Sequence, residues 1–289
     1  MQPIIDKNNL SNKLSGAILS ETDFKRISQF IYANYGINIE PKKKLLLQSR
    51  LHKRLRLLKI SNFKDYIEYV FSKHGEEEIT HMIDVVSTNK TDFFREPSHF
   101  DFLTNHILPE FIQSKPSKKT LNLWSAACSS GEEPYTIAIV LNEFITKNPA
   151  FNYSILATDI CTSVLEKAKT AIYSEEKISE IPTILKKKYF LKSKENNKNV
   201  VQIVSNIREK VHFNRLNFME KQYDVKEMFD IIFCRNVLMY FDFETKEKVI
   251  NKLCKHLRQG GYFILGQTEI FASENVPLQP IISTIFQKV

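Results

Sequence analysis

One stretch decides how this sequence folds: residues 121–135, which read LNLWSAACSSGEEPY. An apolar segment runs into a row of small residues, and Pro134 then stands in the first turn of a segment whose apolar residues Ile137 and Leu141 recur at helical spacing. This order predicts a strand, a tight turn and a helix. The small residues let a ligand approach the backbone closely, as in nucleotide sites at the carboxyl edge of a doubly wound sheet.

The predicted turn differs from a phosphate-binding loop. It is not G-x-G-x-x-G, and Glu132 and Glu133 stand where a pyrophosphate would otherwise dock on free N–H groups. These carboxylates disfavour a phosphate and favour a cationic or zwitterionic ligand. An ordinary strand-to-helix turn, with two glutamates that stabilise the helix dipole, explains the same residues and stays open on spacing alone.

The sequence beyond this stretch alternates between short apolar segments and amphipathic helices, which is typical of a parallel α/β sheet. The predicted strands are residues 121–126, 154–160, 211–216, 230–234, 262–266 and 284–288. We expect Gly260 or Gly261 to end the helix before the fifth of them. A lysine-rich stretch that leads into the alternating run 200–204 breaks the rhythm, so an inserted hairpin or small sheet is predicted over about residues 174–210.

Polar side chains follow two of these strands. Asp159 stands at the end of the second predicted strand, and Arg235 and Asn236 directly follow the fourth. Because the carboxyl ends of parallel strands meet at one edge, we expect these side chains beside the small-residue turn, where Asp159 can grip a pair of ribose hydroxyls. An N-cap for a helix that starts near Thr162 also explains Asp159.

The residues before the α/β region predict a small all-helical domain. Ser20 and Asp23 have capping-box spacing, so a helix is expected to begin near Thr22. Further helices are predicted by the leucine stripe Leu47, Leu51, Leu55 and Leu58 and over residues 63–71 and 76–86. The expected organisation is a flexible tail at 1–19, a helical domain at 20–86, a linker at 87–98 and an α/β domain at 99–289.

The predicted linker carries two aromatic residues, Phe93 and Phe94, directly before Arg95. The two rings can pin this segment against the α/β domain and so bring Arg95 to its edge. Core anchors followed by a surface salt bridge are the simpler interpretation of the same three residues.

The charge of the chain favours an anionic partner. Lys and Arg total 41 against 33 Asp and Glu, and residues 42–64 contain basic but no acidic residues. Arg50, Lys53 and Arg56 lie on one face of the predicted second helix, away from the leucine stripe. Nucleic acid, an acidic protein and anionic lipid remain open as partners, and so does a simply solvated helix face.

Composition excludes several other classes. With 289 residues, 43% of them hydrophobic, the chain can bury a sizeable core. Its four cysteines form no C-x-x-C pair, so we expect reduced thiols and no metal site. No apolar stretch reaches the roughly 20 residues of a membrane span, and residues 1–20 lack the apolar core of a secretion signal, so a cytoplasmic protein is expected.

Four segments, in this order, resemble the CheR family of S-adenosylmethionine-dependent glutamate methyltransferases of bacterial chemotaxis receptors. They are TNKTDFFRE at 88–96, WSAACSSGEEPY at 124–135, ATDI at 157–160 and FCRNVLMYF at 233–241. The resemblance runs from about residue 20 to the end. It implies a helical domain, then a Rossmann-like methyltransferase domain with a small β-subdomain, which agrees with the break predicted at 174–210.

The resemblance also implies roles for individual residues. The cofactor-binding residues would be Asn89, Thr91, Arg95, Ala126, Glu133, Asp159, Asn217, Phe218, Arg235 and Asn236. Within this set, Ala126 and Glu133 would frame the methionine part and Asp159 would hold the ribose. Asn217 and Phe218 would flank the adenine. Arg95 and Tyr240 would face the reacting methyl group as the catalytic pair, and Arg50, Lys53 and Arg56 are expected to dock the substrate.

The implied reaction is methyl transfer to the γ-carboxylates of glutamates in the cytoplasmic domains of methyl-accepting chemotaxis receptors, with S-adenosylhomocysteine as the other product. A glutamate is already ionised at neutral pH, so the reaction needs no general base. We expect a monomer recruited to membrane chemoreceptor arrays, without membrane insertion or nucleic-acid binding. The alternatives are a methyltransferase of RNA or a small molecule, and a non-catalytic docking module that senses the cofactor.

Overall fold

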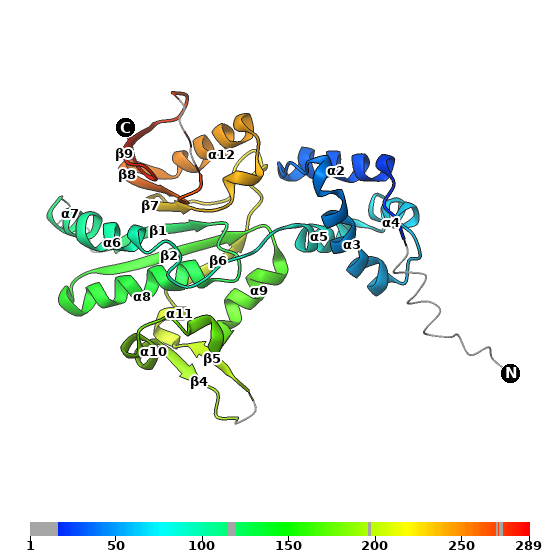
Figure 1. Ribbon diagram of the computed structural model, residues 1–289. Coiled ribbons are helices and arrows are strands. Elements are labelled where there is room, and N and C mark those ends of the chain that lie inside the picture. Colours follow the sequence, from blue (N-terminus) through cyan, green and yellow to red (C-terminus); the bar gives the residue numbers. More distant parts are fainter. Residues whose placement is uncertain (1–16, 115–119, 196–197, 270, 272–273) are drawn as a thin grey trace. The chain divides into compact units, whose positions relative to one another are not determined.

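The computed structural model describes residues 17–114, 120–195, 198–269, 271 and 274–289 (Figure 1). The chain divides into a helical unit up to Thr88, joined by Tyr240–Asp242, and an α/β unit of Asn89–Met239 and Phe243–Val289. Residues 1–16 of the expected tail lie outside the described residues. Leu19, just before the first described helix, is buried, and its N–H donates to Gln48 Oε1 over 2.9 Å.

The helical unit contains the four predicted helices: α2 (Glu21–Tyr35), α3 (Lys44–Leu58), α4 (Phe63–Val70) and α5 (Glu76–Val86). The expected cap of α2 is confirmed, because the Ser20 hydroxyl accepts the Asp23 N–H over 3.0 Å. Along α3, Leu47, Leu51 and Leu55 are buried, whereas Leu58 at the end of the helix is half-buried. One apolar stripe therefore fixes how α3 packs within its own unit.

The α/β unit is built on a seven-stranded sheet with the order β6-β2-β1-β7-β8-β10-β9. Its strands are β1 (Thr120–Ala126), β2 (Asn152–Asp159), β6 (Val211–Arg215), β7 (Phe229–Cys234), β8 (Leu257–Leu265), β9 (Leu278–Ile282) and β10 (Ile285–Lys288). The first five in the spatial order are parallel and β10 is antiparallel to both neighbours. The chain moves outward from β1 in one direction to β6 and returns to β7 on the other side, so the switch point lies between β1 and β7.

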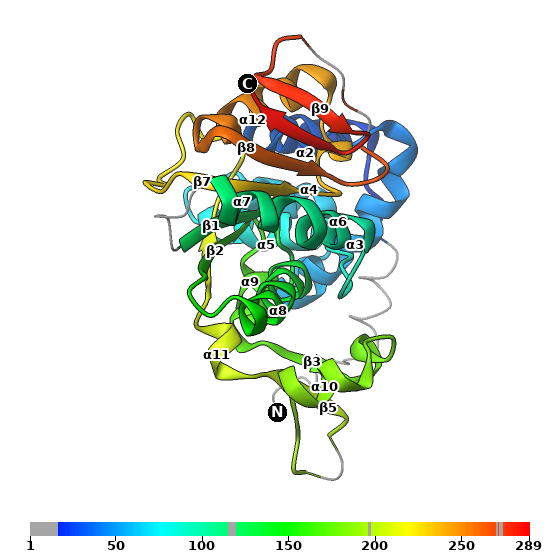
Figure 2. The ribbon, with the colours of Figure 1, turned by 90° about the vertical axis from the view of Figure 1, so that its left-hand side faces the viewer.

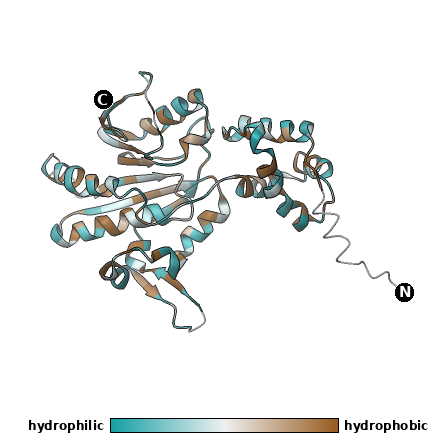
Figure 3. Cartoon of the chain, viewed as in Figure 1, coloured by the Kyte–Doolittle hydropathy of each residue, from teal (hydrophilic) through white to brown (hydrophobic). Residues whose placement is uncertain are grey.

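Alternating side chains of β1 serve the two faces of this sheet. Leu123 packs in one core cluster with Ile137 and Leu141 of α8 (Glu132–Lys147). The Trp124 ring lies on the other face, where the His256 ring after α12 (Phe243–Lys255) is 5.7 Å away. The helices of this unit carry hydrophobic and hydrophilic residues side by side along their length (Figure 3). Outside the insertion, the α/β unit also contains α6 (Ser98–Phe102), α7 (Leu108–Ser114) and α9 (Thr162–Thr170), with a π-helical turn at Leu103–Ile107.

The predicted insertion is confirmed as a three-stranded antiparallel sheet with the order β3-β5-β4. Its elements are β3 (Ile172–Ser174), a 3-10 turn at Glu175–Ile178, α10 (Thr183–Tyr189), β4 (Phe190–Lys192), β5 (Val200–Ile203) and α11 (Ser205–Arg208). Figure 2 shows these elements as a lobe below α8. Phe93 packs edge-on against Tyr173 and Phe190, so the expectation that this residue is a core anchor holds.

Two predictions near the carboxyl terminus are wrong. Gly260 and Gly261 do not end a helix: α12 ends at Lys255 and both glycines lie within β8. Gly260 has a φ of 72°, and a Cβ on Gly261 would stand 3.0 Å from the Asp230 carbonyl oxygen, so β8 needs glycine where its pairing with β7 shifts register. Strand β9 was not predicted; it contains Pro280, which a strand at the edge of the sheet tolerates.

A buried ion pair holds the helical unit together. Arg54 of α3 donates to both carboxylate oxygens of Glu78 in α5, over 2.8 and 2.6 Å. The Tyr66 hydroxyl of α4 donates to the same carboxylate over 2.9 Å. Glu78 is 2% exposed, so its charge depends on these donors.

We predict that Arg54→Met lowers the free energy of unfolding of the helical unit by about 3 kcal/mol, because it leaves a buried carboxylate without its cation. Urea denaturation followed by circular dichroism measures the change. Lys53→Met, an exposed neighbour on the same helix, is the matched control and should change stability by less than about 0.5 kcal/mol. Equal stabilities of the two variants would contradict the assignment.

Candidate active site

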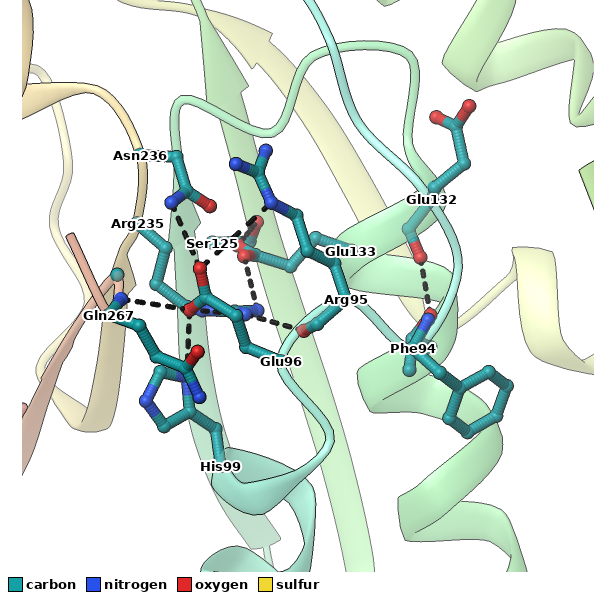
Figure 4. A network of polar contacts seen from close by, with 12 residues as sticks. Phe94, Arg95, Glu96, His99, Ser125, Glu132, Glu133, Arg235, Asn236 and Gln267 are labelled. Carbon is teal, nitrogen blue, oxygen red and sulfur yellow. Dashed lines mark hydrogen bonds and ion pairs between the residues drawn. The ribbon is translucent and has the colours of Figure 1, made fainter.

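Arg235, directly after β7, is the centre of a buried ion-pair network (Figure 4). Its side chain is 2% exposed. One terminal nitrogen donates to Glu133 over 3.0 Å, and the other donates to Glu96 over 2.9 Å and to the Arg95 carbonyl over 2.5 Å. The guanidinium thus joins the end of β7, the start of α8 and the segment before α6.

Glu96 accepts more than the arginine. The Asn236 side-chain amide and the Gln267 N–H also donate to its carboxylate, each over 3.1 Å. Burial acts to raise the pKa of Glu96, but the hydrogen bonds from Asn236 and Arg235 outweigh it and hold that pKa below its usual value. Figure 4 shows Arg235, Asn236 and Gln267 converging on this one carboxylate, which therefore stays ionised.

The two glutamates at the start of α8 differ in their surroundings. Glu133 accepts the Ser125 hydroxyl of β1 over 2.7 Å as well as Arg235. Glu132 accepts the Ser130 hydroxyl over 2.7 Å and lies 3.7 Å from the Lys177 ammonium group. Burial raises the pKa of both carboxyls. Glu133 therefore holds Arg235 in place. Because both glutamates stand at the start of α8, this helix start is unsuited to an anionic ligand.

Asp159 fixes the small-residue turn after β1. Its two carboxylate oxygens accept the N–H groups of Ser129 and Cys161, over 2.8 and 2.9 Å. Asn89 joins this cluster, since its carbonyl accepts the Ser129 hydroxyl over 2.9 Å and its amide donates to the Cys161 sulfur over 3.4 Å. Ala127 of the same turn has a positive φ of 68°. The turn is therefore held in a strained shape by side chains from other segments.

Cys128 lies inside this turn, and its role is structural. Its side chain is 1% exposed, and burial together with the negative charge of Asp159 raises the pKa of its thiol well above the usual value. Its N–H donates to the Thr158 carbonyl over 2.9 Å. A protonated, buried thiol of this kind packs rather than reacts.

The loop after β6 is held by a lysine that the sequence did not single out. Lys252 of α12 donates to the carbonyls of Phe218 and Glu220, and the Tyr223 hydroxyl also donates to Phe218, over 3.1 Å. Burial lowers the pKa of Lys252. A cavity of about 300 Å³ beside this loop is lined by Thr158, Asn214, Arg215, Leu216, Glu220, Asp224 and Val225. It adjoins Asp159 and Asn217 along the chain.

The structure brings most of the sequence-predicted site residues to the carboxyl edge of β1, β2 and β7. The Thr91 carbonyl accepts Lys177 over 2.7 Å, and the partly exposed Arg95 side chain donates to the Lys90 carbonyl over 3.1 Å. Tyr240 groups with the helical unit, where its carbonyl accepts the Asn38 N–H over 2.9 Å.

The expected docking residues lie on α3 in the helical unit. The Arg50 guanidinium donates to the carbonyls of Val86 and Ser87 and to the Thr88 hydroxyl, so it closes the end of α5. Lys53 and Arg56 are exposed. Of the three expected docking residues, Arg50 therefore has a structural role, and Lys53 and Arg56 lie at the surface.

These residues fit a nucleoside ligand that has no phosphate. The Asp159 carboxylate stands at the end of β2 beside the small-residue turn, at the edge where the ribose of a bound nucleoside would lie. The Nε of Arg235 is buried without a hydrogen-bond partner among the described residues. The small residues of the turn allow close approach. The two fixed glutamates at the helix start suit a ligand that carries a cation.

The doubly wound sheet with its inserted β-subdomain and this edge define a Rossmann-like domain with a nucleoside-type site. A family model described as "CheR methyltransferase, SAM binding domain" matches residues 89–286, and one described as "CheR methyltransferase, all-alpha domain" matches residues 22–87. The chain belongs to the CheR methyltransferase family. Its cofactor is S-adenosylmethionine, and the fold class expected from the sequence is confirmed.

Relatives span nearly the whole chain. It is 38% identical to the chemotaxis protein methyltransferase of Borreliella burgdorferi, over 97% of this chain and 99% of the relative. It is 35% identical to that of Escherichia coli, over 88% of this chain and 86% of the relative. Among solved structures, PKMT2 from Rickettsia typhi in complex with AdoHcy covers 51% of this chain and 21% of its own, at 16% identity and a TM-score of 0.32, which is too weak a likeness to bear on function.

Neither a group of metal ligands nor a membrane-spanning helix is found among the described residues. In that part of the chain, no three His, Cys, Asp or Glu side chains gather as metal ligands. No helix found there has both the length and the apolar character that crossing a membrane requires. All four cysteines are buried and none forms a disulfide.

His99 makes the network sensitive to pH. Its Nδ1 lies 3.5 Å from Glu96, its Nε2 is 2.9 Å from the Thr284 hydroxyl, and the side chain is 2% exposed. Burial, reinforced by the positive charge of Arg235 and opposed by Glu96, lowers the pKa of His99 to about 4. Between this value and its unfolded pKa of about 6.5 the unfolded chain binds more protons, so stability falls as pH falls through that range.

We predict that His99→Gln weakens this pH dependence. Urea denaturation at pH 7 and pH 5 should show a smaller loss of unfolding free energy in the variant than in the wild type. His74→Gln, at an exposed histidine, should keep the wild-type dependence. The same loss in all three proteins would show that His99 is not buried in its neutral form.

Proposed function

We propose that this protein transfers the methyl group of S-adenosylmethionine to glutamate γ-carboxylates in the cytoplasmic domains of chemoreceptors, giving glutamyl methyl esters in chemotaxis adaptation. The relatives named as chemotaxis protein methyltransferases support the setting. The choice of a carboxylate as the acceptor rests on the titratable side chains around the site. Their surroundings decide whether any of them can take a proton from the substrate.

Four titratable groups in and beside the network, those of Glu96, Glu133, Cys128 and His99, are not poised as bases. Glu96 and Glu133 are held in ion pairs with Arg235. Cys128 is buried and protonated, and His99 has a pKa of about 4 and lies against Thr284. An amine or hydroxyl acceptor has a proton to lose, whereas a glutamate carboxylate is ionised at neutral pH. A carboxylate acceptor is therefore the one that this environment suits.

In this proposal the chain contributes positioning rather than proton transfer. Bound S-adenosylmethionine supplies a methyl group on a cationic sulfur. Asp159 would hold the ribose hydroxyls, and Asn217 and Phe218 would flank the adenine. Arg95, which is partly exposed, would pair with the acceptor carboxylate, and Tyr240 would orient it. Alignment of two reactants in this way can supply several kcal/mol of the barrier reduction.

The docking surface in this proposal is the exposed part of α3. Lys53 and Arg56 would attract the acidic surface of a receptor, and through it bring the protein to membrane receptor arrays. Arg50 is less free to do so because its guanidinium is engaged at the end of α5. The proposal therefore assigns substrate attraction mainly to the two exposed residues.

The acceptor can be tested by the chemistry of the product. Receptor-containing membranes labelled with radioactive methyl by this protein should release volatile label as methanol above about pH 10, because an ester hydrolyses in mild alkali whereas an N-methyl group is stable. Purified RNA should remain unlabelled, since phosphate attraction alone does not align an acceptor atom with the methyl group. Alkali-stable label on protein, or stoichiometric label on RNA, would reject the proposal.

Charge reversal tests the docking surface. Lys53→Glu with Arg56→Glu should raise the receptor KM by about tenfold at low salt, and added salt should shrink the difference. The Kd for S-adenosylmethionine, measured by calorimetry, should stay within about twofold of wild type. The matched control is Lys25→Glu with Lys73→Glu, two exposed lysines of the same unit. An equal KM for both double variants would remove α3 as the docking surface.

A further inference from the structure

A buried carboxylate outside the Arg235 network, that of Glu269, lies beyond the end of β8 and is 6% exposed. It accepts four backbone N–H groups. One oxygen accepts those of Asn236 and Gly266, over 2.7 and 2.9 Å, and the other accepts those of Leu238 and Met239, over 2.7 and 3.3 Å. Three of these four donors belong to the short segment 236–239, which follows Arg235.

The geometry explains why a carboxylate belongs there. Three backbone N–H groups within the four residues 236–239 point to one place and need acceptors, and the bond from Leu238 is fully buried. A carboxylate can accept all of them because each of its oxygens takes two bonds, and bonds to an ionised acceptor are the stronger kind. Glutamine at this position would turn an amide NH₂ toward two of the same donors.

The segment held by Glu269 is strained at Asn236 and closely approached there by Gly266. Asn236 has a φ of 59°, a left-handed conformation that is uncommon outside glycine. Its side-chain amide donates to Glu96 over 3.1 Å. On its other side Gly266 approaches so closely that a Cβ would stand 2.5 Å from the Asn236 amide nitrogen and 2.9 Å from its backbone nitrogen. Three groups therefore set the position of one asparagine.

We infer that Glu269 is a positioning residue of the active site: by binding the backbone of segment 236–239, it holds Asn236 toward the cofactor. This rests on the proposed role of Asn236. Among the described residues, the hydrogen bonds to the Glu269 carboxylate come from backbone N–H groups, so Glu269 acts through the segment and takes no part in the chemistry itself.

The test compares Glu269→Gln with Glu274→Gln, an exposed glutamate that follows in the chain. Without cofactor, the amides of Asn236, Leu238 and Met239 should exchange hydrogen at least tenfold faster in Glu269→Gln, as expected for the loss of about 1.4 kcal/mol of local protection. By calorimetry, its Kd for S-adenosylmethionine should rise about tenfold, while Glu274→Gln matches wild type in both measurements.

A second variant covers the case in which Glu269→Gln does not fold. Gly266→Ala leaves the carboxylate in place but forces Asn236 away, so its Kd for S-adenosylmethionine should rise to a similar extent. Faster exchange with an unchanged Kd in Glu269→Gln would show that the carboxylate only stabilises the fold, and an unchanged Kd in Gly266→Ala would reject the positioning of Asn236.

These measurements need no receptor. A wild-type protein that binds S-adenosylmethionine but transfers no methyl to receptors would overturn the proposed acceptor and the role of Tyr240. The exchange and affinity results would still decide whether Glu269 positions Asn236.

Discussion

The buried guanidinium of Arg235 between Glu96 and Glu133 is the interaction on which the rest of the site depends. A buried cation is stable only when it is paired and its hydrogens are used, and here two carboxylates and a backbone carbonyl meet that demand. The partners stand 102 and 139 residues away along the chain. They can meet because the sheet places β7 beside β1. The end of β7, the start of α8 and the segment before α6 therefore lie together at the switch point of the sheet.

The same edge concentrates backbone strain. Phe94, Glu96, Ala127, Ser129 and Asn236 all have positive φ angles although none is glycine. Such residues cost of order 1–3 kcal/mol each and persist where surrounding contacts over-determine them. Side chains from other segments supply those contacts: Asp159 binds the turn, Glu269 binds the segment after β7, and the Thr136 hydroxyl accepts the Phe94 N–H over 3.1 Å. The site is therefore shaped before a ligand arrives, which suits a reaction that depends on alignment.

How much the sequence could predict follows from the range of the interactions. Local patterns sufficed for the helices of the first unit, the parallel strands and the inserted sheet, because periodicity and capping are read within a few residues. Arg235 was expected among the cofactor-binding residues, but its two carboxylate partners could not be paired with it from sequence at separations of 102 and 139 residues. Glu269 and Lys252 left no signal, because their partners are backbone groups, which every residue carries. Gly260 was wrongly predicted to cap a helix. A glycine within a strand and a glycine after a helix give the same local sequence signal, and only the pairing of β8 with β7 distinguishes them.

A crystal structure of the protein with S-adenosylhomocysteine would test the central claim most directly, namely that this edge is a cofactor site already assembled around Arg235. In this complex we expect the ribose hydroxyls within about 3 Å of the Asp159 carboxylate, with Arg235 still bound to both Glu96 and Glu133. A nucleoside bound away from Asp159, or an arginine released from its two carboxylates to contact the ligand, would contradict it.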